Sequence, residues 1–134
     1  MIRLTALLCR NPALSAEEFT THWRDVHAPL ILSVPGIERW VVRYEQHPRV
    51  PASASAGPWT GSDGVDGMTL QWFRSVDDLM AMISDPEYRR LVGPDEQYLL
   101  DLSRSTFLLS DEPRLVIGEP GAAGRPVRRE EPQP

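Results

Sequence analysis

The amino-acid sequence predicts an α+β domain in which strands and helices follow the order βαββαβ, with the four strands in one antiparallel sheet. Four short runs rich in apolar and β-branched residues have the length of strands. Between them, two segments repeat apolar residues at the helical period, and each follows a Ser with an acidic residue three positions later, the pattern of a helix N-terminal cap. The length of 134 residues fits one domain with a modest core.

The first strand and the first helix occupy the N-terminal part of the sequence. Residues 2–9 form an apolar run that ends in a turn, and Ser15 with Glu18 predicts the start of a helix. Pro29 lacks an amide proton, so we expect a kink or a loosened turn just after His27. The apolar face of this helix is expected to carry Phe19, Trp23, Val26, His27, Leu30 and Ile31.

The second strand is expected at residues 37–47, with Tyr44 on one face and Val41 on the other. A loop rich in Pro, Ala, Ser and Gly follows at residues 48–66 and is too poor in apolar side chains to pack on its own. This flexible loop nevertheless contains Trp59. We interpret Trp59 either as part of a lid over a binding site or as a contact with another molecule.

The C-terminal half of the sequence supplies two strands and a helical region. The third strand is expected at residues 67–74, and the fourth at residues 103–109, with a further extended stretch at residues 115–117. The helical region begins at Ser75 and is expected to break at the Asp-Pro and Gly-Pro pairs, residues 85–86 and 93–94.

We therefore expect one domain over residues 1–117 and a disordered tail at residues 118–134. Two helices cover only one face of a four-stranded sheet, yet the predicted strands carry apolar residues on both faces. A bare apolar face would promote aggregation. The sequence therefore predicts a homodimer in which a second copy covers the open sheet face.

The composition excludes several classes of function. The formal net charge of −5 argues against a nucleic-acid partner. The sequence has no apolar run of about 18 residues and no signal-peptide pattern, so we expect a cytoplasmic protein without a membrane partner. All 14 basic residues are Arg, which excludes a Lys Schiff base and is typical of a GC-rich bacterial genome. With Cys9 alone, the chain can form no intrachain disulfide and no thiolate cluster.

Neither a metal nor a cofactor is expected. His22 and His27 are five residues apart, which puts them about 140° apart on a straight helix, unlike the i,i+4 pair of a zinc-binding helix. The sequence also lacks an HExxH motif and a Gly-rich phosphate loop.

The pattern FxxxWxxxHAPL at residues 19–30 resembles the first helix of EthD-type proteins in the dimeric α+β barrel superfamily. The similarity continues in LQWFRS at residues 70–75 and in DPEYRRLVGPDEQYLLD at residues 85–101, and it covers roughly residues 2–112. This resemblance implies a ferredoxin-like protomer, a dimer whose two sheets pack together, and a pocket between the sheet and the helices. It also implies activity without cofactors on phenolic or polyketide-like molecules.

His27 is the main catalytic candidate, because the family motif implies a position at the pocket and a neutral imidazole can act as acid or base near neutral pH. Alternatively, His27 donates to a backbone carbonyl freed by Pro29. The other catalytic candidates are His22, at the helix edge, and Tyr44, as a donor to an oxyanion. The substrate-binding candidates are Trp23, Trp40, Gln71, Trp72, Tyr88, Tyr98 and Trp59. Helix-cap or surface positions are expected for the acidic residues Asp95, Glu96 and Asp101.

We therefore expect a cofactor-independent enzyme of specialised metabolism that acts on an aromatic or polyketide-like intermediate. His27 would serve as acid or base in a cyclisation, dehydration, decarboxylation or isomerisation, all of which need proton transfer in a dry cavity. Two alternatives remain open. One is a non-catalytic accessory dimer that binds a small hydrophobic molecule, and the other is a cofactor-free monooxygenase of the anthrone-oxidising type.

Overall fold

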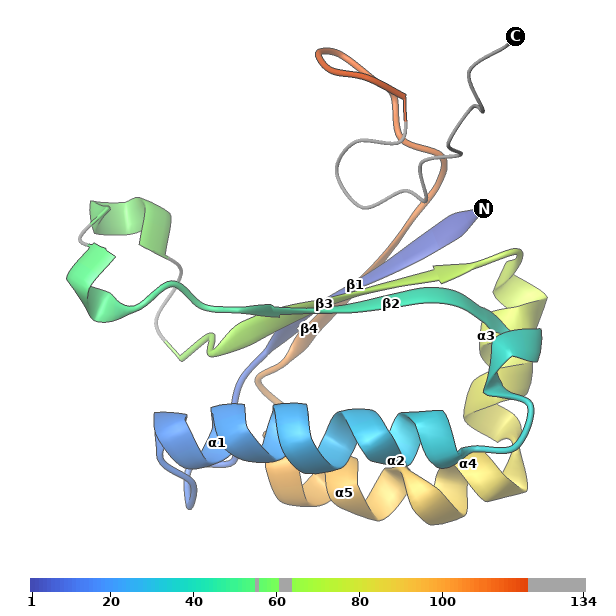
Figure 1. Ribbon diagram of the computed structural model, residues 1–134, viewed down its shortest axis with the longest axis horizontal. Coiled ribbons are helices and arrows are strands. Elements are labelled where there is room, and N and C mark those ends of the chain that lie inside the picture. Colours follow the sequence, from blue (N-terminus) through green and yellow to red (C-terminus); the bar gives the residue numbers. More distant parts are fainter. Residues whose placement is uncertain (55, 61–63, 121–134) are drawn as a thin grey trace, which may run out of the picture.

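The computed structural model describes residues 1–54, 56–60 and 64–120, and it contains a four-stranded antiparallel sheet with the helices on one side (Figure 1). The strand order is β2-β3-β1-β4. This is the split βαβ arrangement, so the predicted α+β class and element order are confirmed. The strands are β1 (Ile2–Leu8), β2 (Val41–Pro48), β3 (Gly67–Phe73) and β4 (Thr106–Ser110).

The register of the central strands decides which side chains face the helices. Ala6 on β1 pairs with Thr69 on β3 and with Phe107 on β4. Because Ala6 is buried in a cluster with the first helix, its paired residues share the helix-facing side of the sheet. Two positions along β3, Gln71 lies on the same side and pairs with Tyr44 of β2.

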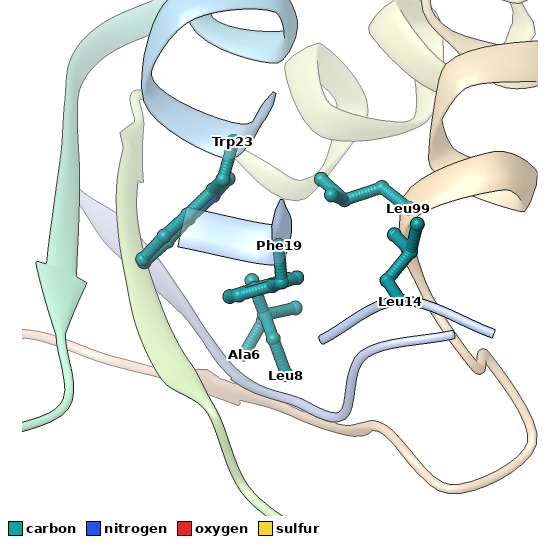
Figure 2. Packing of buried hydrophobic residues seen from close by; sticks show 6 residues of the cluster. All are labelled: Ala6, Leu8, Leu14, Phe19, Trp23 and Leu99. Atoms are coloured by element: carbon teal, nitrogen blue, oxygen red, sulfur yellow. The ribbon is translucent and has the colours of Figure 1, made fainter. Parts of the chain in front are cut away.

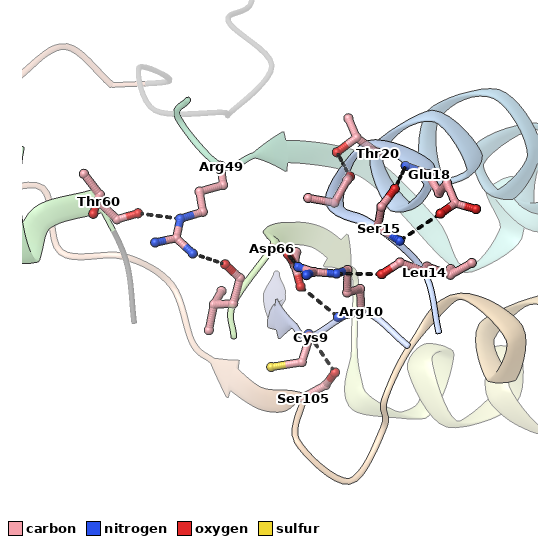
Figure 3. Close-up of polar contacts among 12 residues, drawn as sticks. Cys9, Arg10, Leu14, Ser15, Glu18, Thr20, Arg49, Thr60, Asp66 and Ser105 are labelled. Carbon is pink, nitrogen blue, oxygen red and sulfur yellow. Dashed lines mark hydrogen bonds and ion pairs between the residues drawn. The ribbon is translucent and has the colours of Figure 1, made fainter. Parts of the chain in front are cut away.

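The first helical segment begins at the predicted capping box. The Ser15 hydroxyl accepts from the Glu18 amide and the Glu18 carboxylate accepts from the Ser15 amide, both at 3.0 Å (Figure 3). The segment then continues without a break through three consecutive pieces: α1 (Ala16–His22), the π-helix η1 (Trp23–His27) and α2 (Ala28–Ser33).

The π-turn ends at His27, two residues before Pro29. The amide of Ala28 donates to the carbonyl of Trp23, five residues earlier. In a regular α-helix a proline ring clashes with the carbonyl four residues earlier, and a wider turn relieves this clash. The predicted loosened turn is therefore present, although it ends at His27 and does not begin after it.

The helical region after β3 consists of three helices, one more than the sequence predicts. Side-chain oxygens of Ser75 and Asp85 cap the first two by accepting from backbone amides three residues later. The predicted break at Gly93 and Pro94 is present, since α4 ends at Leu91, but these residues also begin a further helix, whose first turn tolerates proline. The helices are α3 (Val76–Ser84), α4 (Pro86–Leu91) and α5 (Gly93–Leu99).

Strand β2 starts later than predicted. A short 3₁₀-helix, η2 (Ile37–Arg39), precedes the strand, which begins at Val41. A register shift between Val41 and Arg43 adds one residue to this strand relative to β3. Val41 and Tyr44 therefore both lie on the helix-facing side, and their predicted placement on opposite faces is wrong.

Two 3₁₀-turns, η3 (Ala52–Ala54) and η4 (Gly57–Thr60), lie in the described parts of the predicted loop. The Arg49 guanidinium links the start of the loop to its later part by donating to the carbonyls of Thr60 and Val65, at 3.1 and 2.9 Å (Figure 3). The loop therefore has local structure that its composition does not suggest.

Residues 111–120, the described part of the segment after β4, do not extend the sheet. The extended stretch predicted at residues 115–117 is exposed and forms no strand. Of the predicted tail, residues 121–134 lie outside the described residues. None of the helices in the described ranges is long and apolar enough to span a membrane.

Two buried apolar clusters lie between the sheet and the helices. Figure 2 shows the first cluster, where the Phe19 ring lies beside Ala6 and Leu8 of β1 and the Trp23 ring extends toward β3. This first cluster comprises Ala6, Leu8, Leu14, Phe19, Trp23 and Leu99. The second cluster comprises Val34, Ile37, Phe73, Leu79, Met82 and Val92.

No helix of the described residues lies on the opposite face of the sheet (Figure 1). Leu7 and Leu108 on this face are 39% and 64% exposed. The guanidinium groups of Arg3 and Arg43 lie 6.0 and 5.7 Å from the ring centre of Trp72. The open face is therefore a mixture of apolar and charged side chains, and it is more polar than the sequence predicts.

Candidate active site

A cavity of about 70 Å³, called the inner cavity below, lies between the helix-facing side of the sheet and the helices. Its polar lining comes from Tyr44 on β2, Thr69 and Gln71 on β3, and from His27, Tyr88 and Glu96. Its apolar lining comes from Ala6, Leu8, Trp23, Ile31, Leu99, Leu100, Leu102 and Phe107. Side chains distant in the sequence thus meet around one small space.

His27 is buried, with 6% of its surface exposed, and lines the inner cavity from the π-turn. Its Nδ1 lies 2.8 Å from Oδ2 of Asp95 on α5. An ionised carboxylate can only accept, so we assign the ring proton to Nδ1 and a lone pair to Nε2. The alternative in which His27 donates to a backbone carbonyl near Pro29 is not the arrangement found.

Asp95 forms hydrogen bonds with two imidazoles. Besides its contact with His27, its Oδ1 lies 2.6 Å from Nε2 of His22. Residues five apart lie on different sides of a straight α-helix, but a π-turn is bonded from i to i+5 and places such residues one above the other. The π-turn therefore explains how His22 and His27 both reach one carboxylate. No group of three or more His, Cys, Asp or Glu side chains within the described ranges is arranged to hold a metal ion.

His22 lies outside the inner cavity. Its side chain is 22% exposed, and its ring centre is 4.8 Å from that of Tyr98. Both residues line an outer groove along α1. His22 and Tyr98 were predicted at the cavity, but neither lines it. His22 is linked to the cavity residue His27 only through Asp95, which both rings contact.

Tyr88 and Glu96 form a second polar pair in the cavity wall, where the Tyr88 hydroxyl donates to Oε1 of Glu96 at 2.8 Å. Burial raises the pKa of Glu96, and the Tyr88 hydrogen bond and the nearby His27 oppose that rise only in part. Burial and the neighbouring Glu96 charge also raise the pKa of Tyr88. Glu96 therefore keeps a proton more readily than an exposed carboxyl does, which suits a general acid.

Only some of the predicted substrate-binding residues line the inner cavity: Trp23, Gln71 and Tyr88. Trp40 packs against the second apolar cluster, and Trp72 lies on the open face of the sheet. Trp59 is 89% exposed on η4 and is not part of the cavity lining. The presence of an aromatic side chain in the sequence therefore does not by itself predict that the residue lines the inner cavity.

Asp95 and Glu96 are site residues that the sequence prediction assigns to cap or surface positions. The signal for them was their place in the acidic segment that resembles the EthD family. Their spatial roles depend on α5, which carries Asp95 to the first helix and Glu96 to the cavity. The sequence prediction places a break at Gly93 but no separate helix after it, so it does not reveal that arrangement.

A second cavity of about 480 Å³, called the outer cavity below, adjoins the inner one. The two cavities share four wall residues, which are Gln71, Tyr88, Glu96 and Phe107. The outer cavity is otherwise mostly apolar, with Leu4, Leu79, Met82, Ile83 and Leu109 in its lining. A ligand with a polar end and an apolar body would suit this pair of spaces.

Comparisons of the sequence with known proteins give one family. The sequence profile of the EthD domain matches residues 11–103. The dehydratase ustZ of Ustilaginoidea virens is 25% identical over 125 residues, which are 89% of each chain. The conidial pigment biosynthesis dehydratase EthD of Metarhizium robertsii is 26% identical over 114 residues, which are 81% of this chain and 80% of the relative. Both relatives are fungal, so the expected bacterial origin gains no support from them.

Comparison with solved structures gives the same fold. A protein from Bacteroides fragilis, described as dimeric and as having a ferredoxin-like fold, aligns with a TM-score of 0.59 at 12% identity. The alignment covers 83% of this chain and 95% of that chain. The expected ferredoxin-like fold is therefore confirmed.

Proposed function

The chain belongs to the EthD domain family, and from this premise we propose that it is a cofactor-independent dehydratase of specialised metabolism acting on an aromatic or polyketide-like intermediate. The names of the two relatives support a dehydration over the cyclisation, decarboxylation and isomerisation that the sequence leaves open. The pigment biosynthesis named for one of them supports the proposed substrate class.

The environment of His27 is the observation that most supports this proposal. The residue is buried, its ring orientation is fixed by Asp95, and one ring nitrogen is free at the cavity. In the proposed reaction, Nε2 removes a proton from the carbon next to a substrate carbonyl. Asp95 stabilises the imidazolium that forms, since its carboxylate already accepts from Nδ1.

Glu96 is the proposed general acid. Because its pKa is raised, Glu96 holds a proton more readily than an exposed carboxyl does, and in the proposed reaction it gives that proton to the departing hydroxyl group. One C–H and one C–O bond break, a C=C double bond forms, and water leaves. The proton held by His27 then returns to Glu96 through water, which restores both groups for the next turnover.

The aldol adduct of naphthaldehyde and acetone is a suitable test substrate, because it is a β-hydroxyketone whose dehydration gives an enone with strong near-ultraviolet absorbance. We expect His27→Gln to lower the rate of enone formation by about 10²- to 10⁴-fold. His47→Gln is the matched control, because this third histidine lies on β2 and pairs with Glu45 away from the cavity lining.

The outcomes of this assay distinguish the proposed dehydratase from the accessory dimer and from the monooxygenase. Full turnover by the His27→Gln variant would contradict the proposed base. Binding of the adduct without turnover by the wild type would favour the non-catalytic accessory dimer. Oxygen consumption during turnover would favour the monooxygenase.

We also propose that the protein forms a homodimer through the open face of the sheet. The description of a structurally similar protein as dimeric supports this proposal. The apolar side chains exposed on that face and in the segment after β4 support it as well, because apolar groups exposed together are typical of an interface. They include Leu7, Leu108, Leu115, Val116 and Ile117.

A further inference from the structure

Trp23 places an unpartnered hydrogen-bond donor in the wall of the inner cavity. The residue is 2% exposed, and its buried Nε1 makes no hydrogen bond of ordinary geometry among the described residues, although it lies near the Tyr44 hydroxyl. The indole cannot turn to find one, because it stacks on Phe19 with ring centres 5.3 Å apart and packs tightly on Gly67. A Cβ atom at Gly67 would lie only 2.8 Å from the far edge of the indole. Buried N–H groups nearly always have an acceptor, so this one points to an acceptor supplied by a ligand.

Tyr44 supplies a second donor beside the first. The Gln46 amide donates to Tyr44 Oη at 3.2 Å and to the Trp23 carbonyl at 3.0 Å, which fixes both residues. Within the described part of the chain, the hydroxyl proton of Tyr44 has no acceptor. Burial raises the pKa of Tyr44, and the Gln46 amide and the nearby Trp23 N–H partly oppose that rise. The indole N–H and the phenolic O–H are therefore close together at the cavity.

We infer that Trp23 Nε1 and Tyr44 Oη form a subsite for one carbonyl oxygen of the ligand. The inference rests on the proposed function and deepens it. Two donors without an acceptor fit a ketone oxygen, which has two lone pairs and no proton. When His27 removes the neighbouring proton, negative charge develops on this oxygen, and the same two donors stabilise the enolate.

The sizes of the two cavities indicate what the rest of the ligand looks like. The inner cavity of about 70 Å³ is about half the size of a cavity of roughly 150 Å³ that binds benzene, so it takes only the carbonyl and the atoms beside it. The remainder must extend past Gln71 and Phe107 into the outer cavity. Its apolar walls at Leu79 and Met82 fit an aromatic ring system.

Binding of an unreactive pair of probes tests the subsite without any turnover. Naphthylbutanone carries the ketone but no hydroxyl group to eliminate, and butylnaphthalene is the hydrocarbon of matching shape. We expect the wild-type protein to bind the ketone about tenfold more tightly than the hydrocarbon, as measured by calorimetry. Trp23→Phe and Tyr44→Phe should each weaken ketone binding by about fivefold and leave hydrocarbon binding unchanged.

Trp72→Phe is the matched control, because this indole lies on the other face of the sheet and should change neither affinity. Equal binding of ketone and hydrocarbon by the wild type, or no binding of the ketone at all, would overturn the inference. An equal loss for both probes in the folded Trp23→Phe and Tyr44→Phe variants would also overturn it, because the residues would then only pack against the ligand. A ketone preference in a protein without dehydratase activity would refute the proposed function and leave the subsite standing.

Discussion

Asp95 is the residue that orients the proposed base His27, although it is not in the cavity lining. Each of its oxygens accepts from one imidazole, and its side chain is 12% exposed. Such a carboxylate fixes the tautomer of its partner ring and stabilises the cation formed when that ring takes a proton. Asp95 therefore acts through His27, as a positioning residue.

Replacing Asp95 by Asn should lower the rate of enone formation by about 10²- to 10⁴-fold, with little change in the affinity for naphthylbutanone. An amide can present N–H to Nδ1 as readily as oxygen, so the productive tautomer loses its support. Asp25→Asn is the control, because Asp25 is exposed and pairs with Arg24 on the same helix. A variant Asp95→Asn with the wild-type rate would remove Asp95 from the mechanism.

Glu96 should make the stability of the fold depend on pH. Burial raises its folded-state pKa above the unfolded value, so its contribution to stability is present below the unfolded pKa and is lost as pH rises through the folded pKa. Glu96→Gln mimics the protonated form at every pH. We expect this variant to be more stable than the wild type in alkaline buffer and to lose that advantage in acid. Urea unfolding across pH measures the difference, and a difference independent of pH would contradict the raised pKa.

At the scale of elements, the π-turn is the feature that assembles the site. Pro29→Ala restores an amide proton and removes the ring clash, so a regular α-turn becomes available at residues 23–27. His22 and His27 could then no longer both reach Asp95, and we expect enone formation to fall by at least about tenfold. The free energy of unfolding should stay equal or rise, because Ala is the better helix former.

Pro86→Ala provides the control for this substitution, since Pro86 occupies the first turn of α4, where proline is compatible with a helix. Rate and stability are measured by enone formation and by urea unfolding. Wild-type activity in Pro29→Ala would show that the π-turn is not needed for the site.

Local sequence signals predicted most elements but not the arrangement of the site. The Ser15 capping box and the apolar runs of the strands act over a few residues, and their structures agree with the prediction. The Gly-Pro pair at residue 93 is ambiguous, because proline can follow a helix or begin one. The placement of Asp95 and Glu96 depends on how α5 packs against the first helix, which is a tertiary contact. His27 was predictable because a family motif carries it.

At the scale of the whole molecule, the open sheet face should determine the oligomeric state. Leu108 lies on that face and is 64% exposed, so an Asp in its place would put a charge into the proposed interface. Light scattering should give the mass of two chains for the wild type and of one chain for Leu108→Asp. Leu32→Asp, on α2 and 77% exposed, should remain a dimer. A monomeric wild type would contradict the proposed dimer.

The proposed mechanism depends most on the tautomer of His27, that is, on which ring nitrogen of the neutral imidazole carries the proton. Long-range ¹H–¹⁵N spectra of the full chain, assigned with His27→Gln, distinguish a protonated ring nitrogen from a bare one. At a pH where the ring is neutral, we predict a proton on Nδ1 of His27 and a lone pair on Nε2. A neutral His27 that carries its proton on Nε2 would contradict the account, because the nitrogen proposed as the base could not accept a proton.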